Sequence, residues 1–337
     1  MEGGLAELHT HLGGSVSSDI LWSLAHRQGI ALPVKDYWDF DRLVTVSDPR
    51  GVADLDALDA IYHWTELIQS SPAAVEVSVH GAIGGAYRSQ GITTLELRFN
   101  PMKRNRGGER DLDHIILAAI RGLDVASLEY PQVRAGLILM MDRTFTQRQN
   151  EIIVEKAIRW APRGIVGIDI AGPRPGHERY EYAQVQPMIE EARAAGLGVT
   201  IHVGEEGAEH GRTEIGEVLE VLRPDRIGHG ILAAGDRGLM TALRECEVVL
   251  EICPTSNLLT KALPDDAAVR DVIRTFVDHG VQFTIATDGP EMMRTHLRDE
   301  FELLLRVGAL TQEELQEANR RGHEASFVRS STHAARV

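Results

Sequence analysis

Short apolar stretches rich in β-branched residues recur along the chain and alternate with longer stretches whose apolar residues follow the helical period. The short runs have the length and composition of buried strands. They cover residues 5–12, 93–99, 134–141, 165–171, 199–203, 226–230, 248–253 and 282–287. Because strands alternating with helices form parallel β-α units, eight such units predict an α/β fold, the (β/α)8 TIM barrel.

The stretches between these runs predict the helices of the barrel. They cover residues 112–128, 151–160, 183–195, 215–222, 237–244 and 266–279. Glycines such as Gly164 and Gly280 stand where a helix should end and the next strand begin. After the last strand, residues 297–308 form an amphipathic pattern, and a capping box from Thr311 to Glu314 predicts one more helix.

The first connection, residues 13–92, is far longer than one helix and predicts a helical insertion with segments at 18–28, 53–69 and 72–89. Insertions after a barrel strand fall on the catalytic face, so this one is expected to cover the active site. Its apolar cluster either lines the ligand pocket or only packs the insertion onto the barrel, and we favour packing. That cluster is Ile61, Tyr62, Trp64 and Leu67. No repeat or linker divides the chain, so residues 1–337 are expected to form a single domain.

Composition narrows the class of ligand and the compartment. The chain has 337 residues, 43% of them hydrophobic, and a net charge of -15, which argues against a nucleic-acid partner and favours a small-molecule ligand. Cys246 and Cys253 are too few for a disulfide framework, so we expect a cytoplasmic protein and an inert Cys253 in the core. The longest apolar run, residues 135–141, is too short to span a bilayer, and the sequence leaves a homo-oligomer open.

Residues able to bind a metal stand at the ends of four of the eight predicted strands. They are His9 and His11 on the first, His202 on the fifth, His229 on the sixth and Asp288 on the eighth. Alternate residues of a strand point the same way, so the two histidines of the first strand share a face. In a barrel these ends meet at one mouth. Three imidazoles and a carboxylate suit a zinc ion with one position open for water, and His9, His11, His202 and Asp288 are the expected ligands.

Two further residues near these ends are candidates for proton transfer. Glu205 lies three residues beyond His202. A carboxylate beside a cation is normally ionised, but in a closed pocket it can accept a proton and pass it to a substrate. His229, taken alone, fits a structural role and a catalytic role equally well. Glu206 and Glu209 are expected to face solvent.

Seven motifs in order along almost the whole chain resemble the adenosine deaminase family of the amidohydrolase superfamily. They are ELHTHL at 7–12, ELRF at 96–99, GIDIAG at 167–172, HVGEEG at 202–207, RIGHG at 226–230, CPTSN at 253–257 and TD at 287–288. The resemblance implies one zinc ion, because the fourth strand lacks the lysine that two-metal relatives carboxylate; another divalent metal stays open.

The resemblance also implies a role for each matching residue. The zinc would activate a water molecule that attacks the amine-bearing carbon of a purine, releasing ammonia and a 6-oxopurine. Glu205 would protonate the adjacent ring nitrogen, and His229 would orient the water and help to deprotonate it. The backbone N–H of Gly172 would contact the purine. Asp169 would support that loop, and Arg98 fits a buried ion pair equally well.

Two departures from the family pattern concern substrate recognition. Gly13 stands where adenosine-specific members carry Asp and adenine-specific members carry Glu. Gly289 stands where most members carry a second Asp, a contact that water or Glu291 would have to replace. Residues 173–176 also lack the usual acidic residues. A missing polar partner generally signals a different ligand.

The departures lead us to expect an adenine nucleoside with a bulky or apolar 5′ substituent, as in the aminodeoxyfutalosine deaminase branch that serves menaquinone synthesis. The alternatives are adenosine, free adenine, an N6-substituted purine or another aminated heterocycle such as a pterin. A catalytically silent purine-binding barrel is the remaining reading. It is disfavoured because every catalytic residue of the pattern is retained.

Overall fold

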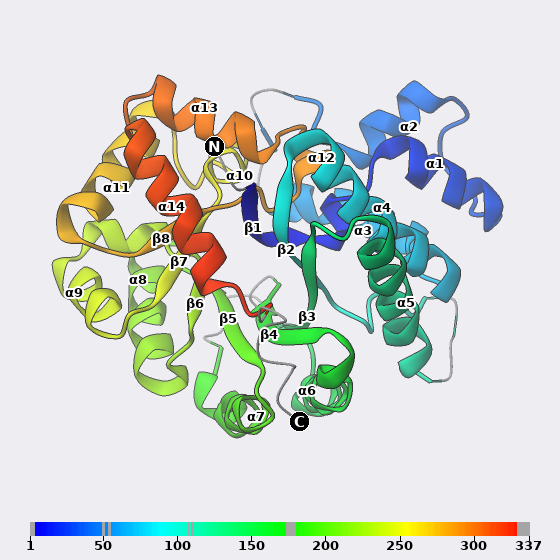
Figure 1. The fold of residues 1–337 in the computed structure, drawn as a ribbon, viewed down its shortest axis with the longest axis horizontal. Helices are drawn as coiled ribbons and strands as arrows, with labels where there is room; N and C mark the ends of the chain where they lie inside the picture. The colour runs from blue at the N-terminus through cyan, green and yellow to red at the C-terminus, as the bar shows by residue number, and fades with distance from the viewer. Residues whose placement is uncertain are drawn as a thin grey trace.

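Eight parallel strands form one sheet in the order β1 to β8, and the sheet curls into an almost closed barrel (Figure 1). The computed structural model describes residues 4–48, 51–52, 55–106, 108, 111–172 and 180–328. The strands are β1 Leu5–His11, β2 Ile92–Phe99, β3 Arg134–Asp142, β4 Ile165–Ala171, β5 Gly198–Val203, β6 Arg226–His229, β7 Val249–Ile252 and β8 Phe283–Ile285. The predicted TIM barrel is confirmed, with strand ends that differ from the predicted ones by one or two residues.

The first and last strands of the barrel are joined at residues that the sequence predicts to bind a metal. Asp288, three residues beyond the end of β8, forms an isolated parallel bridge with Thr10 of β1. The backbone N–H of Asp288 donates to the carbonyl of His9 at 2.9 Å, and the N–H of His11 donates to the carbonyl of Asp288 at 2.7 Å. The two ends of the sheet are therefore joined at three of the predicted metal ligands.

Helices surround the barrel, and their termini follow local sequence chemistry. They are α5 Asp113–Glu129, α6 Gln147–Trp160, α7 Tyr182–Ala194, α8 Ala208–Glu217 with its continuation η3 Val218–Leu222, α9 Arg237–Glu245, α11 Asp266–His279, α13 Leu297–Arg306 and α14 Gln312–Ala325. Thr146 and Gln149 cap α6 reciprocally, and the predicted capping box from Thr311 to Glu314 opens α14. Gly280, at φ 68°, ends α11. None of the helices in the described ranges has the length and apolarity needed to cross a bilayer.

The connection between β1 and β2 is helical, as predicted, and contains one helix that the pattern did not reveal. It holds α1 Ser18–Arg27, α2 Tyr37–Val44, α3 Leu55–Ile68 and α4 Pro72–Gln90. Helix α2 has only two buried residues, Phe40 and Val44, so its apolar period is hard to recognise. Residues 53 and 54 of the predicted second segment lie outside the described residues. Two short helices, α10 Pro254–Leu259 and α12 Pro290–Met293, follow β7 and β8 and were also not predicted.

The apolar cluster of the insertion serves both of the roles considered above. Ile61 and Tyr62 pack against a small second core formed with Met292 and Met293, and Trp64 packs against the main core. Tyr62 also lines the large pocket at the barrel mouth. The packing interpretation therefore holds for Ile61 and Trp64 but is incomplete for Tyr62.

The C-terminal segment seals the opposite end of the barrel. Helix α14 lies over that end in Figure 1. Phe327, two residues after α14, packs against the backbone of β4 and β5. A Cβ added at Gly198 on β5 would lie 2.2 Å from the Phe327 ring. The Arg226 guanidinium lies 3.6 Å from the Phe327 ring centroid and donates to the carbonyl of Ala325 at 2.6 Å. Glu96 accepts from the Ser326 hydroxyl at 2.8 Å and from the Phe327 N–H at 2.5 Å. Residues 325–328 thus form a stopper for the barrel.

Glu300 on α13 makes stability depend on pH. Burial raises the pKa of its carboxyl to about 7. Hydrogen bonds from the Thr295 hydroxyl at 2.8 Å and the Thr255 N–H at 3.0 Å lower the pKa but do not outweigh burial. The folded state thus holds a proton that the unfolded chain loses near pH 4.5, so this stabilisation is complete below pH 4.5 and is lost as the pH rises through 7. Urea unfolding should show a loss of about 2–3 kcal/mol between about pH 5 and 8 from this residue alone.

The matched variants separate Glu300 from other titrating groups. Glu300→Gln should flatten this part of the pH profile, because glutamine keeps both hydrogen bonds without titrating. Glu302→Gln, on the exposed side of the same helix, should keep the wild-type profile. An unchanged slope in Glu300→Gln would contradict the assignment.

Candidate metal centre and catalytic pocket

A pocket of about 360 Å³ opens at the mouth of the barrel formed by the C-terminal ends of the strands. Most of the predicted site residues line it: His11, Gly13, Gly172, His202, Glu205, His229 and Asp288. Helix α3 of the insertion forms part of its wall through Leu58, Tyr62, His63 and Glu66. Residues from at least five strands or strand ends therefore converge on one cavity, as a barrel active site requires.

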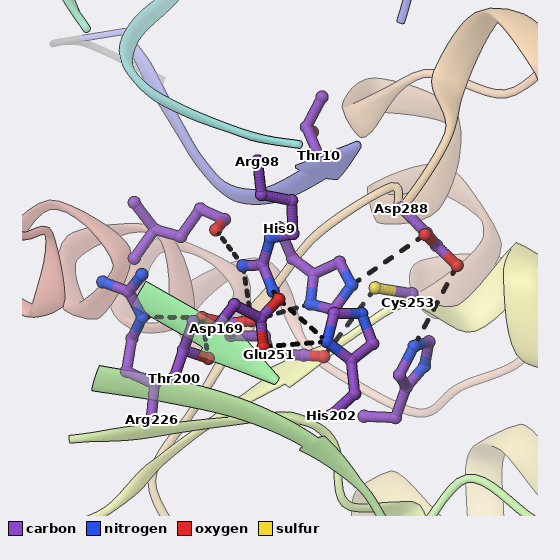
Figure 2. A network of polar contacts seen from close by, with 12 residues as sticks. His9, Thr10, Arg98, Asp169, Thr200, His202, Arg226, Glu251, Cys253 and Asp288 are labelled. Atoms are coloured by element: carbon purple, nitrogen blue, oxygen red, sulfur yellow. Dashed lines mark hydrogen bonds and ion pairs between the residues drawn. The ribbon is translucent and has the colours of Figure 1, made fainter. Parts of the chain in front are cut away.

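The four predicted metal ligands lie together at the bottom of this pocket. His11 Nε2 lies 3.0 Å from His202 Nε2 and 3.3 Å from Asp288 Oδ1. His9 Nε2 lies 3.9 Å from the same Asp288 oxygen. The ligating atoms of the three histidines lie within 4.8 Å of one another, and Figure 2 shows His9, His202 and Asp288 turned toward a common point.

The protonation of these histidines fits a metal ion. His9 Nδ1 lies 2.7 Å from Glu251 Oε2, and His202 Nδ1 lies 3.0 Å from Asp169 Oδ2. An ionised carboxylate only accepts hydrogen bonds, so each Nδ1 carries the proton and each Nε2 directs a lone pair inward. His9 Nε2 is buried and has no hydrogen-bond partner in the described part of the chain. Burial and neighbouring positive charge lower the pKa of His9 and His11 well below the usual value, which keeps both rings neutral.

Arg98 holds the two carboxylates that orient these histidines. Its Nη1 lies 3.0 Å from Asp169 and its Nη2 lies 2.8 Å from Glu251, all three groups being fully buried (Figure 2). Burial opposes ionisation of Asp169, but His202 and Arg98 outweigh it and bring its pKa to about 2. Burial likewise opposes ionisation of Glu251, and Arg98 and Arg226 bring its pKa to about 2. Both carboxylates therefore stay ionised and fix the tautomers of His202 and His9.

Replacing Asp169 by asparagine should weaken metal binding by about 10- to 100-fold, because a neutral amide would replace the ionised carboxylate that fixes the tautomer of His202. Competition with a chromophoric chelator measures this affinity directly. Asp124→Asn, which removes a surface carboxylate paired with Arg163 at 2.9 Å, is the matched control and should bind metal as the wild type does. Wild-type affinity in a folded Asp169→Asn protein would show that this contact does not orient a ligand.

Glu205 and His229 face each other above this cluster. Burial raises the pKa of Glu205, whose Oε1 accepts from Thr260 Oγ1 at 3.2 Å and from Asn257 Nδ2 at 3.4 Å. Burial also lowers the pKa of His229 to about 4, so its ring is neutral near pH 7. His229 Nδ1 accepts from Asn257 Nδ2 at 3.0 Å, which places the ring proton on Nε2. That Nε2 lies 3.5 Å from Glu205 and 4.0 Å from Asp288, so His229 presents an N–H donor to the pocket.

Both His229 and Asp288 have a backbone conformation that is uncommon outside glycine. Their φ angles are 61° and 66°, in the left-handed region. Such residues cost about 1 kcal/mol or more and cluster at functional sites, where the surrounding structure enforces them. Here the turn at the end of β6 and the turn after β8 direct these two side chains into the pocket.

Several residues of the site were not predicted from sequence. Ser256 on α10 donates to Asp288 Oδ2 at 2.7 Å, while Asn257 and Thr260 position Glu205 and His229 as described above. Glu251 was also missed. A charged residue in the otherwise apolar strand VLEI, and the polar run Thr255-Ser256-Asn257 that begins three residues after that strand, are the signals that could have indicated them.

The residues expected to contact substrate fall into two groups. Gly13 and Gly172 line the pocket, and a Cβ on Gly172 would lie 2.8 Å from the Asp142 carboxylate oxygens. Gly289 is not among the lining residues; a Cβ there would lie 3.2 Å from Met292 and 3.3 Å from the Tyr62 hydroxyl oxygen. Glu291 lines a different cavity, between α4 and β1.

The remaining sequence expectations concern two acidic residues near Glu205, the loop after Gly172, and Cys253. Glu206 is exposed, as expected. The side chain of Glu209 and the whole segment 173–176 lie outside the described residues. Cys253 is fully buried, and burial raises the pKa of its thiol well above the usual value, as expected for an inert core residue.

Sequence comparison places this chain beside adenosine deaminases over nearly its whole length. The family model described as adenosine deaminase matches residues 4–335. An adenosine deaminase from Shewanella denitrificans is 29% identical over 333 residues, covering 98% of this chain and 96% of the relative. One from Vibrio parahaemolyticus is 28% identical over 330 residues, covering 96% and 93%.

Structure comparison finds the same fold in several solved proteins. Adenine deaminase from Arthrobacter aurescens superposes with a TM-score of 0.83 at 22% identity, covering 98% of this chain and 96% of that chain. The N6-mAMP deaminase of Arabidopsis gives 0.81 at 23% identity, covering 98% and 95%. An amidohydrolase from Burkholderia ambifaria with bound Zn gives 0.83 at 22% identity, covering 98% and 88%.

Proposed function

This chain belongs to the adenosine deaminase family, and from that premise we propose that it removes the 6-amino group of an adenine nucleoside that carries a substituent at the 5′ position. Its membership makes it a hydrolytic deaminase that acts on purines. The observation that carries the finer proposal is the pocket itself, in which Glu205 and His229 face the histidine cluster and Gly13 contributes no polar side chain to the wall formed by Tyr62 and Arg104.

His9, His11, His202 and Asp288 are the residues proposed to hold one zinc ion, the metal bound in the Burkholderia protein of the same fold. Three imidazoles and one carboxylate suit that ion. When bound, zinc polarises water and lowers its pKa toward neutrality. We also propose that residues 13–92 form the cover of this site within a single domain, since α3 contributes to the pocket wall.

The protein's own groups supply the proton transfers. Glu205, whose pKa is raised by burial, holds a proton that it can donate to the purine ring nitrogen next to the amine-bearing carbon. Protonation there removes the ring's aromatic stabilisation and opens the carbon to attack by water. The His229 N–H donates to the attacking oxygen and orients it, while Asp288 is placed to accept a hydrogen from it. Asn257 keeps both Glu205 and His229 in position.

The substrate proposal rests on the wall of the pocket beside Gly13. Gly13 has no side chain to bind a free 5′-hydroxyl, and the Tyr62 ring and Arg104 Nη2 lie 3.0 and 3.2 Å from where its Cβ would be and form this part of the wall. We therefore propose that the 5′ position carries a substituent rather than a free hydroxyl. An aminodeoxyfutalosine-like nucleoside is one such compound. Adenine and N6-mAMP are the substrates named for two proteins of the same fold, and they are the competing substrates to compare.

A substrate panel tests this proposal. Ammonia release should be measured for adenosine, adenine, N6-methyl-AMP and a set of 5′-substituted adenine nucleosides, with the protein loaded with zinc. We expect at least one 5′-substituted nucleoside to exceed adenosine in kcat/KM. Faster turnover of adenosine than of every substituted nucleoside would overturn the proposal, as would turnover of adenine alone.

A further inference from the structure

We propose that the pocket wall beside Gly13 is an anion-binding subsite, and that Arg104 recognises a phosphate or carboxylate group carried on the 5′ side of the nucleoside. This inference rests on the proposed function and names the chemistry of the substituent that the function leaves open. The observations that support it are the burial and the contacts of Arg104, not the arrangement of the catalytic residues.

Arg104 is a buried arginine that lacks a protein counterion. Its side chain is only 2% exposed, and its Nε and Nη1 atoms are buried without a hydrogen-bond partner among the described residues. No carboxylate in the described ranges forms an ion pair with it, although the charge of Glu66 acts on it from farther away. Burying an unpaired guanidinium is costly, so a counterion that arrives with a ligand would relieve an existing penalty.

The other buried arginines of the described residues all have hydrogen-bond partners, and two of them pair with carboxylates. Arg98 is paired with Asp169 and Glu251, and Arg226 is paired with Glu96 and Glu251. Arg143 donates to the carbonyl of Gly172 at 3.0 Å and to that of His202. Each of these side chains has a structural partner. Within the described part of the chain, Arg104 is therefore the buried arginine that has no ion pair and two guanidinium nitrogens without a hydrogen-bond partner.

The guanidinium lies where a 5′ substituent would pass. Arg104 Nη2 would be 3.2 Å from a Cβ built on Gly13, and both residues line the pocket. Gly13 follows His11 by two residues, so this wall adjoins the metal cluster. A group extending from the nucleoside past Gly13 would meet the guanidinium directly.

The neighbouring charges favour an anion at this wall. Arg106, with its Nη1 3.2 Å from His63 Nδ1, also lines the pocket and is exposed at its rim. Lys103 is already paired with Asp142 at 2.6 Å. Arg104 and Arg106 have no carboxylate partner among the described residues, although acidic side chains such as Glu66 and Glu206 also line the pocket. A guanidinium binds a phosphate or a carboxylate through paired hydrogen bonds.

The glycine at position 13 also explains why Arg104 has no carboxylate partner on this side. An aspartate at position 13 would place a carboxylate beside Arg104 Nη2 and neutralise it within the protein. Glycine at position 13 keeps that charge for a ligand. The substrate class is therefore an adenine nucleoside with an anion on its 5′ side.

The first experiment compares charged and neutral nucleosides. The zinc-loaded protein should deaminate AMP or adenosine-5′-carboxylic acid with a kcat/KM about 10- to 100-fold above that of adenosine. Whichever anion is preferred identifies phosphate or carboxylate as the group recognised. Calorimetry with IMP, the 5′-carboxylate of inosine and inosine measures the same preference without turnover.

These two readouts separate the failure of the subsite from the failure of the proposed function. Deamination of adenosine at least as fast as that of both anions, with no tighter binding of either charged inosine compound, would overturn the subsite. Loss of all nucleoside deamination, with tighter binding of a charged inosine compound retained, would instead overturn the proposed function and support the subsite.

Two independent variants test the residue itself. Arg104→Gln should lower the ratio of anionic to neutral kcat/KM by about 10- to 100-fold, and Arg104→Lys should lower it less. Gly13→Asp, at a position without a positive φ, should also lower the ratio by pairing with Arg104 while leaving the guanidinium in place. Arg148→Gln, on the exposed face of α6, is the control and should keep the wild-type ratio. A wild-type ratio in both Arg104→Gln and Gly13→Asp would overturn the proposal.

Discussion

Replacing Glu205 by glutamine is expected to lower kcat by about 10³- to 10⁴-fold, the largest effect of any single substitution in the pocket that leaves the metal ligands intact. Glutamine has nearly the same shape and can keep its contacts with Asn257 and Thr260, but it cannot transfer a proton. Steady-state kinetics with the preferred substrate measures the loss. Calorimetric binding of the deaminated product should persist, because the shape of the pocket is retained.

An exposed glutamate that does not line the pocket provides the control for this substitution. Glu220→Gln changes such a carboxylate and should retain kcat close to the wild-type value. If Glu205→Gln kept wild-type turnover, Glu205 would not be the proton donor. Proton transfer would then have to be assigned to another group of the pocket.

Removing the metal is expected to abolish turnover to a similar extent, by about 10³-fold or more, and to lower the Tm. The expectation follows from the ring nitrogens of His9, His11 and His202, which the fold brings within 4.8 Å of one another beside Asp288. Dialysis against a chelator, followed by addition of one equivalent of zinc, should abolish and then restore both activity and Tm. Unchanged activity in protein shown by elemental analysis to be free of metal would contradict the assignment.

A histidine substitution tests the same cluster without a chelator. His11 and His202 are less buried than His9. Unlike those of His9 and His202, the Nδ1 of His11 has no carboxylate contact among the described residues. His11→Gln should therefore lower the metal content with little loss of folding. His210→Gln, at an exposed position of α8, should bind metal as the wild type does.

The barrel and its metal ligands could be predicted because their signals are local and repeated. Each strand is an apolar run of recognisable length, and parallel strands place their C-terminal ends at one mouth. The spacing of His9 and His11 fixes their common direction on β1. Once the strands were identified, His202 and Asp288 followed from their positions at strand ends.

The groups that support the site could not be predicted in the same way. Helix α10 has six residues, too few to show a helical period, yet it supplies Ser256 and Asn257. The contact of Arg104 with the wall at Gly13 joins residues about 90 positions apart, and no local pattern encodes it. Glu251 is different, because a lone carboxylate inside a buried strand already implies a buried cationic partner.

The stopper formed by residues 325–328 has a consequence for how the barrel is made. Translation delivers this segment after all eight strands, so a nascent chain can align its sheet before the stopper exists. Until Phe327 arrives, the ring face under Arg226 and two of the donors to Glu96 are absent, and water reaches that end of the sheet. A chain released after Ala325 would therefore carry all eight strands and one unsealed end.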